Sequence, residues 1–175
     1  MNTYEFELEF KLLENENFDK YIDQLFEAGC NDATIGHGLQ GFVHAMFHRE
    51  AENALDAVSS AIDNILTAIP HAKLIKADPF LMNLSEMADL FKCTKQNLSK
   101  YATGKSAVKN SFPRPLIYGK TDYWHILDIA IWLKTHTKMD ISDSTIEILK
   151  VIRALNAEIE NRKIEKFEGL EAIAA

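Results

Sequence analysis

Residues 84–104 read Leu-Ser-Glu-Met-Ala-Asp-Leu-Phe-Lys-Cys-Thr-Lys-Gln-Asn-Leu-Ser-Lys-Tyr-Ala-Thr-Gly, the pattern of two short helices joined by a tight break. Apolar residues first recur at helical spacing, at Leu84, Met87, Ala88 and Phe91. Lys92-Cys93-Thr94 then interrupts the pattern, and Thr94 can cap a second helix over residues 95–102. That helix should end before Gly104, because glycine suits the left-handed position after a helix C-terminus. Helix, tight turn, helix is the supersecondary unit of many DNA-binding proteins.

The second helix has a polar face that suits DNA recognition. Leu98 should point inward as its anchor, and the small Ala88 lets the two helices approach closely. The DNA-binding residues expected on this helix and at its cap are Thr94, Lys95, Gln96, Asn97, Ser99 and Lys100. Glutamine can read adenine with two hydrogen bonds, lysine can reach guanine or a phosphate, and a helix N-terminus attracts anions. The alternative is an ordinary helical hairpin with a solvated polar face.

The segment that follows has the pattern of a wing. Residues 112–115, Phe-Pro-Arg-Pro, cannot be helical, and residues 116–124 read as strand, turn and strand around Gly119-Lys120-Thr121. Arg114 and Lys120 are well placed on this hairpin to contact phosphates. One more helix is then expected, with an apolar face of Ile126, Ile129, Ala130 and Leu133.

Three motifs in this order resemble the winged helix-turn-helix of excisionase-like and MerR-like bacterial DNA-binding proteins. They are the stretch 84–104, the Phe-Pro-x-Pro of residues 112–115, and the Tyr-Trp-x-x-x-Asp-Ile-x-x-Trp-Leu of residues 123–133. The resemblance implies that the helix 94–102 enters the major groove and that the wing touches the DNA backbone. One departure is Lys92, where the family usually has a turn glycine; lysine can adopt the left-handed conformation at modest cost.

The distribution of charge supports this interpretation. The whole chain has a net charge of −7, which by itself argues against a nucleic-acid binder. Residues 1–79 carry 5 Lys and Arg against 14 Asp and Glu, whereas residues 80–139 carry 9 against 4. The positive charge is therefore concentrated in the part of the chain that contains the expected DNA-binding module.

The first 79 residues predict an acidic domain of a different kind. Polar and apolar residues alternate strictly from Tyr4 to Leu12, and the order after that strand is helix, hairpin, helix and strand. This order indicates a ferredoxin-like βαββαβ domain over residues 1–79, within an α+β fold. Residues 28–34 and 47–51 also resemble the N-terminal half of uncharacterised bacterial proteins that carry such a DNA-binding module.

Residues 140–175 are expected to form a C-terminal helix. Its apolar residues follow a 4-3-4 spacing that suits a coiled-coil seam: Ile148, Ile152, Leu155 and Ile159. We expect this seam to pair two copies into a homodimer. The alternative is that the helix packs back on its own chain.

Other classes of site have weaker sequence support. His37, His44 and His48 lie on or near one hairpin, but strand residues four apart are about 13 Å distant, too far to share a metal directly. The string of Gly36, Gly38 and Gly41 matches a dinucleotide-binding spacing, yet no long helix opens directly behind it. We therefore expect no catalytic residues, no metal and no cofactor.

Nothing in the sequence predicts export or membrane insertion. The N-terminus is acidic, whereas a signal peptide begins with basic residues and an apolar block. Cys30 and Cys93 lie far apart and have no metal or redox spacing. A cytoplasmic location without contact to a membrane is the expectation.

The sequence thus predicts three parts, an acidic domain at 1–79, a winged helix-turn-helix at 80–139 and a dimerising helix at 140–175. The expected function is sequence-specific binding of double-stranded DNA in the regulation of transcription, without catalysis. A second hypothesis is an antitoxin or phage-related interaction protein whose acidic domain binds a protein partner. A third is a regulator that senses a small molecule.

Overall fold

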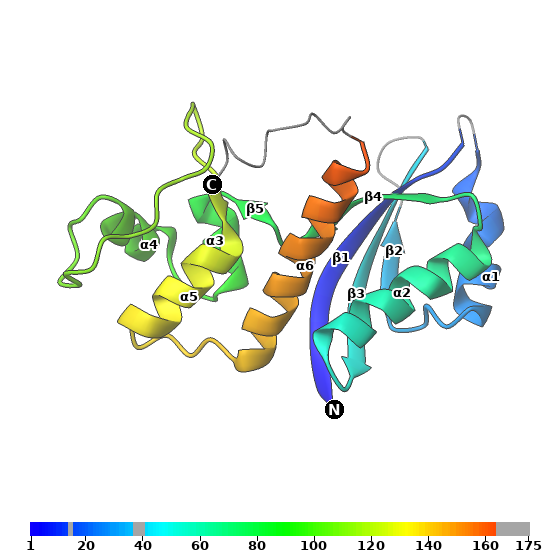
Figure 1. The fold of residues 1–175 in the computed structure, drawn as a ribbon, viewed down its shortest axis with the longest axis horizontal. Helices are drawn as coiled ribbons and strands as arrows, with labels where there is room; N and C mark the ends of the chain where they lie inside the picture. The colour runs from blue at the N-terminus through cyan, green and yellow to red at the C-terminus, as the bar shows by residue number, and fades with distance from the viewer. Residues whose placement is uncertain (14–15, 37–40, 164–175) are drawn as a thin grey trace, which may run out of the picture.

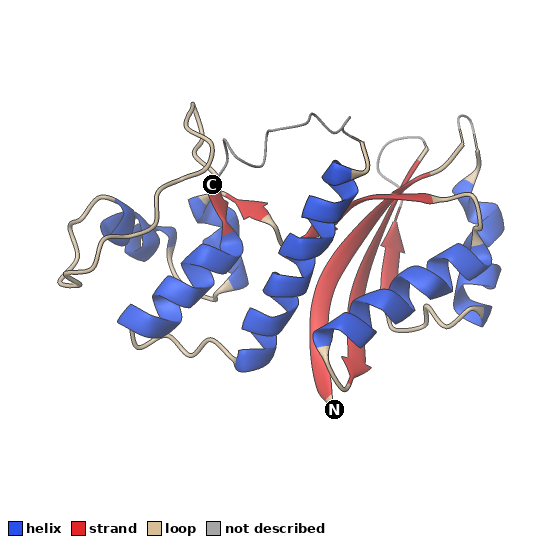
Figure 2. Ribbon diagram, in the orientation of Figure 1, coloured by secondary structure: helices blue, strands red, loops and turns tan. Residues whose placement is uncertain are grey.

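The computed structural model describes residues 1–13, 16–36 and 41–163, and it is a mixed α+β structure. A four-stranded sheet with its helices forms one half of the molecule, and three shorter helices form the other half (Figure 1). A long helix, α6, lies between the two halves (Figure 2). Among the described residues, no helix is both long enough and apolar enough to cross a membrane.

The sheet follows from the alternation in the first strand. The strands are β1 (Asn2–Lys11), β2 (Ala33–Gly36), β3 (Phe42–Ala51) and β4 (Lys73–Asp78), in the order β2-β3-β1-β4 with every neighbouring pair antiparallel. Alternate side chains of β1 are buried, from Tyr4 to Phe10. Glu5, Glu7 and Glu9 point to the opposite face, where they are exposed or half-buried.

Helices cover the buried face of this sheet. They are α1 (Ile22–Glu27), preceded by a 3-10 turn at Phe18–Tyr21, and α2 (Ala54–Ala68). The side chain of Asn53 caps α2 by accepting a hydrogen bond from the Asp56 N–H at 2.9 Å. The element order predicted for residues 1–79, strand, helix, hairpin, helix and strand, is therefore present.

A buried arginine joins two stretches of the first half, residues 28–34 and 47–51. Arg49 donates hydrogen bonds to both carboxylate oxygens of Asp32 at 2.8 Å, and to the carbonyl oxygen of Gly29 at 2.9 Å. Two parallel bonds to one carboxylate are the geometry that arginine satisfies best. The network therefore ties β3 to the loop between α1 and β2.

The second half is built on a two-stranded sheet. The strands β5 (Leu81–Met82) and β6 (Trp124–His125) pair antiparallel. Between and after them come α3 (Leu84–Leu90), α4 (Lys95–Ala102) and α5 (Ile126–His136). The third helix predicted for this half, with Ile126, Ile129, Ala130 and Leu133 inward, is present as α5, and all four of these side chains are buried.

The last helix, α6 (Asp143–Asn161), contradicts the expected dimer seam. Ile148, Ile152 and Ile159 are buried and Leu155 is half-buried, because α6 packs against β1, β4, α2 and α5 of its own chain. The prediction that these residues form a seam between two copies is wrong. The alternative, packing on the same chain, is what the structure has.

Polar contacts anchor α6 to the sheet at two points. The amide of Asn156 accepts a hydrogen bond from the Ala77 N–H at 3.0 Å and donates one to the Ala77 carbonyl at 2.7 Å, so it satisfies both backbone groups at this point on β4. Glu147 accepts a hydrogen bond from the Tyr4 hydroxyl at 2.7 Å, which raises the pKa of Tyr4. The same carboxylate accepts the N–H of Ala54, at the start of α2, at 3.2 Å.

Candidate nucleic-acid interface

The turn between α3 and α4 has the left-handed conformation that the resemblance implied. Lys92 has φ of +51°, the left-handed region, and is the non-glycine residue with positive φ among the described residues. The next residue, Cys93, donates its N–H to the Ala88 carbonyl at 2.9 Å, which closes the turn back onto α3. Burial raises the pKa of the half-buried Cys93 thiol, so that side chain stays protonated within the turn.

Both helices are capped by local side chains. Asn83 caps α3 by accepting the N–H groups of Ser85 and Glu86, and Glu86 reaches back to the Asn83 N–H at 2.8 Å. Thr94 caps α4, as predicted, by accepting the Asn97 N–H at 3.1 Å. The cap by Asn83 was not predicted, although asparagine followed three residues later by glutamate is a pattern that could have revealed it.

The end of α4 also confirms the sequence prediction. Gly104 has φ of +68° and donates its N–H to the Tyr101 carbonyl at 3.1 Å, while Lys105 donates to the Lys100 carbonyl at 2.9 Å. These two bonds satisfy carbonyl groups that the helix itself leaves free. The helix therefore ends where the glycine allows the chain to reverse.

The packing of α4 separates one inward residue from an outward polar face. Leu98 has no exposed surface, and it packs in the same core as Met87 and Ala88 of α3. The side chains of Thr94, Lys95, Gln96 and Lys100 are exposed, whereas Asn97 and Ser99 are half-buried. All six predicted residues of this segment thus lie within the cap and first two turns of one helix.

The hairpin predicted as a wing is smaller than expected. A single bridge joins Ile117 to Tyr123, with the Tyr123 N–H donating to the Ile117 carbonyl at 3.0 Å. The two expected strands do not extend beyond this bridge, because Pro113 and Pro115 have no N–H to donate and Trp124 pairs instead with Met82 of β5. Inside the loop, Asp122 accepts the Gly119 N–H at 3.2 Å.

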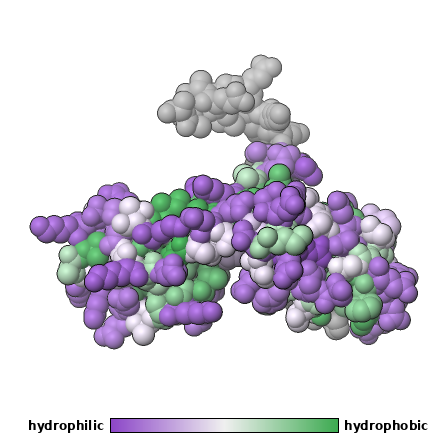
Figure 3. All heavy atoms as spheres, turned by 90° about the horizontal axis from the view of Figure 1, so that it is seen from below, coloured by the Kyte–Doolittle hydropathy of each residue, from purple (hydrophilic) through white to green (hydrophobic). Residues whose placement is uncertain are grey.

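The two cationic residues expected on the wing are exposed, Arg114 just before the bridge and Lys120 at the tip. Large apolar side chains are exposed beside them, with Tyr118 at 74 %. The face of the molecule drawn in Figure 3 is mostly hydrophilic, with hydrophobic side chains gathered mainly on the half that contains α3 to α5.

Aromatic side chains connect the start of the segment 112–124 to α4 and α5. Phe112 lies 6.4 Å from Tyr101 of α4 and 5.0 Å from Trp132 of α5, between ring centroids. The indole N–H of Trp124 donates to the Pro113 carbonyl at 3.0 Å. Aromatic pairs at these distances stabilise their contact, so residues 112–124 and α4 are held by the same aromatic cluster.

The histidines considered for a metal lie on the sheet, away from α4. His44 Nδ1 is 3.2 Å from a carboxylate oxygen of Glu7, and His48 Nδ1 is 3.5 Å from one of Glu5. His37 and Gly38 lie outside the described residues. In the other half, burial lowers the pKa of His125, which therefore stays neutral at the start of α5.

Comparison of the chain with protein-family models, with curated protein sequences and with solved structures finds no match.

Proposed function

We propose that this protein binds double-stranded DNA in a sequence-specific manner and regulates transcription in the cytoplasm. In this proposal residues 80–139 act as a winged helix-turn-helix, with α4 in the major groove and the wing on the backbone. Residues 1–79 form a ferredoxin-like domain, a proposal supported by the strand order β2-β3-β1-β4 with two helices on one face.

The observation that carries the proposal is the geometry of α4. Its anchor Leu98 is fully buried, its N-terminus is capped by Thr94, and its exposed side chains include Lys95, Gln96 and Lys100. A short, rigidly held helix with exposed amide and ammonium groups near its N-terminus presents the donors and acceptors that read base edges and phosphates. The left-handed Lys92 supports the same conclusion, because it allows the tight turn between the two helices.

The charge of the two halves favours the same surface. The net charge of residues 80–139 is +5, from 9 basic and 4 acidic residues, whereas residues 1–79 have −9 from 5 and 14. A nucleic acid would therefore be attracted to the half that contains α4 and repelled by the sheet. Binding through this half displaces counterions from phosphates, so affinity should fall steeply as salt rises.

The experiment is a selection of bound fragments from random double-stranded DNA, followed by titration of the selected sequence across a salt series. We expect enrichment of one motif, and an affinity that decreases linearly with salt on logarithmic axes. Absence of binding at low salt would refute the proposal.

A second candidate function is an interaction protein that binds a partner through its acidic domain. The face of the sheet that the helices leave uncovered favours it. Glu5 and Met46 are exposed on this face, next to the contacts of His44 with Glu7 and of His48 with Glu5. Pull-down of one specific protein by the full chain, without DNA binding in the selection, would favour this candidate.

A further inference from the structure

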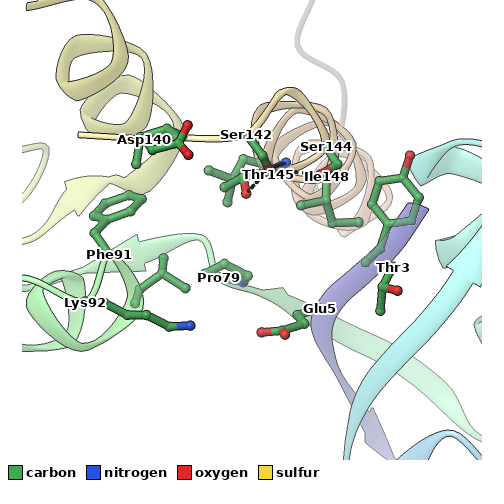
Figure 4. Close-up of a pocket in the computed structure, with 14 residues that line it drawn as sticks. Thr3, Glu5, Pro79, Phe91, Lys92, Asp140, Ser142, Ser144, Thr145 and Ile148 are labelled. Carbon is green, nitrogen blue, oxygen red and sulfur yellow. Dashed lines mark hydrogen bonds between the residues drawn. The ribbon is translucent and has the colours of Figure 1, made fainter. Parts of the chain in front are cut away.

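A cleft separates the sheet from the helix-turn-helix, and it has a chemically mixed lining. Its volume is about 330 Å³, the lower end of the range for small-molecule sites. The lining comes from β1, the turn after α3, and the start of α6 (Figure 4). The cleft thus touches both halves of the molecule.

Opposite charges face each other across the cleft. Lys92, from the left-handed turn, and Glu5, from β1, point toward one another in Figure 4. No ion pair joins them: the carboxylate of Glu5 lies 3.5 Å from His48 Nδ1, and Lys92 forms no ion pair with any residue in the described part of the chain. Asp140 lines the cleft as a second carboxylate. A ligand held between these groups would need both a negative and a positive group.

The rest of the lining combines hydroxyl side chains with apolar ones. Pro79 and Phe91 lie on the side of the helix-turn-helix, and Ile148 lies on the side of α6. The hydroxyl of Ser142 is already paired with those of Ser144 and Thr145, at 2.9 and 2.8 Å. A hydrocarbon group would pack against the apolar side chains of Pro79, Phe91 and Ile148. A ligand with one positive and one negative group would match Glu5 and Lys92.

We propose that the cleft binds a small zwitterion, an α-amino acid with an apolar side chain. Its carboxylate contacts Lys92, its ammonium group contacts Glu5, and its side chain packs against Phe91, Pro79 and Ile148. Lysine at a left-handed position costs more than glycine would, and a ligand contact gives that residue a role.

The test is calorimetric titration of the full chain with three probes of matched shape. L-leucine has both charged groups, 4-methylpentanoate lacks the ammonium group, and 3-methylbutylamine lacks the carboxylate. We expect L-leucine to bind, and each single-charge probe to bind at least about tenfold more weakly, because each loses one charge-assisted contact. No heat with L-leucine, or equal affinity for all three probes, would overturn the proposal.

Two variants locate the site. Lys92→Gly keeps the turn, because glycine accepts φ of +51°, and it should weaken L-leucine binding at least about tenfold; Glu5→Gln should do the same. Lys109→Gly removes an equal charge from an exposed loop residue that does not line the cleft, and should bind L-leucine as the natural chain does. Unchanged binding by both cleft variants would overturn the assignment.

A consequence for regulation rests on the proposed function. Because the ligand touches the turn of the helix-turn-helix, saturating L-leucine should change the affinity for the selected DNA by about fivefold or more. The titration without DNA tests the cleft alone, and the salt series without L-leucine tests DNA binding alone, so the two failures are distinguishable. Unchanged DNA affinity with bound L-leucine would overturn the regulatory consequence.

Discussion

Lys92 has the unusual backbone conformation in the turn between α3 and α4. A non-glycine residue in the left-handed region brings its Cβ close to the following carbonyl, at a cost of about 1–2 kcal/mol. Lys92 is in this region because the chain must reverse between α3 and α4 within three residues. Gly104 solves the corresponding problem after α4 without that cost.

Adding a glycine at position 92 and removing the glycine at position 104 should have opposite effects on the free energy of unfolding. Lys92→Gly should raise the free energy of unfolding by about 0.5–1 kcal/mol, since the relief of strain exceeds the entropy that glycine adds to the unfolded chain. Gly104→Ala should lower it by about 1 kcal/mol, because a Cβ at φ of +68° is strained although no atom lies within 4 Å of it. Urea unfolding measures both, and a less stable Lys92→Gly variant would contradict this account of the turn.

The residues of α4 and of the wing should differ in what they contribute to DNA binding. Lys95→Ala and Gln96→Ala should relax sequence preference, with a loss of about 1–3 kcal/mol at the matched base. Arg114→Ala and Lys120→Ala should weaken binding to all sequences alike, because phosphate contacts carry no direct sequence information. Titration of matched and mismatched sites measures the difference; wing variants that change the preferred sequence would show that α4 is not the reading helix.

At the scale of elements, a buried polar contact that the sequence pattern does not predict holds α6 against β4. Asn156 occupies the middle of an otherwise apolar face, and its amide pairs with both backbone groups of Ala77. Asn156→Ala should lower the free energy of unfolding by about 1–3 kcal/mol, because the buried N–H and C=O lose their partners. Asn161→Ala, at the exposed end of the same helix, is the matched control and should change stability far less. Equal effects in urea unfolding would contradict this role.

The segment before α1 should make stability depend on pH in the acid range. Hydrogen bonds from Lys20, Tyr21 and His71 lower the pKa of Glu16 from 4.5 to about 2 in the folded protein. Because the folded state lowers this pKa, ionised Glu16 contributes its full stabilisation above pH 4.5. This contribution is lost as the pH falls toward 2. Glu16→Gln should therefore reduce the pH dependence of the melting temperature between these values. Glu27→Gln, exposed on α1, is the control, and the same reduction in both variants would contradict the assignment.

At the scale of the whole molecule, α6 belongs to the core that both halves share. Three isoleucines of α6 are buried, and each contributes about 1.5–3 kcal/mol by leaving water. Their sum is a large part of a typical stability of about 5–15 kcal/mol. The other half is joined through α5, which packs against α6 and also forms the exposed ion pair of Asp128 with Arg153 at 2.7 Å.

Deleting residues 143–175 should therefore unfold the chain, instead of leaving a folded monomer. Circular dichroism should show loss of the cooperative thermal transition. A truncated chain that stays folded would show that α6 is dispensable to the core. The homodimer remains a prediction for the full chain, to be measured by light scattering, and its interface would have to lie outside the buried face of α6.

The sequence alone determined those parts of the structure that depend on neighbours along the chain. The alternation of β1, the cap at Thr94, the inward Leu98 and the termination at Gly104 all follow from side chains a few residues apart. Their physical causes are periodicity, backbone sterics and local hydrogen bonds, which the sequence displays directly.

Only the tertiary structure decided which surface each apolar face meets. The spacing of Ile148, Ile152 and Ile159 is the same whether the helix pairs with a second copy or packs on its own sheet, because periodicity identifies a buried face but not its partner. The same holds for the hydrogen bonds of Arg49 with Asp32 and of Asn156 with Ala77, which join residues far apart in sequence. Such pairs form only after the chain has folded, when hydrophobic burial and long-range hydrogen bonds bring distant segments together.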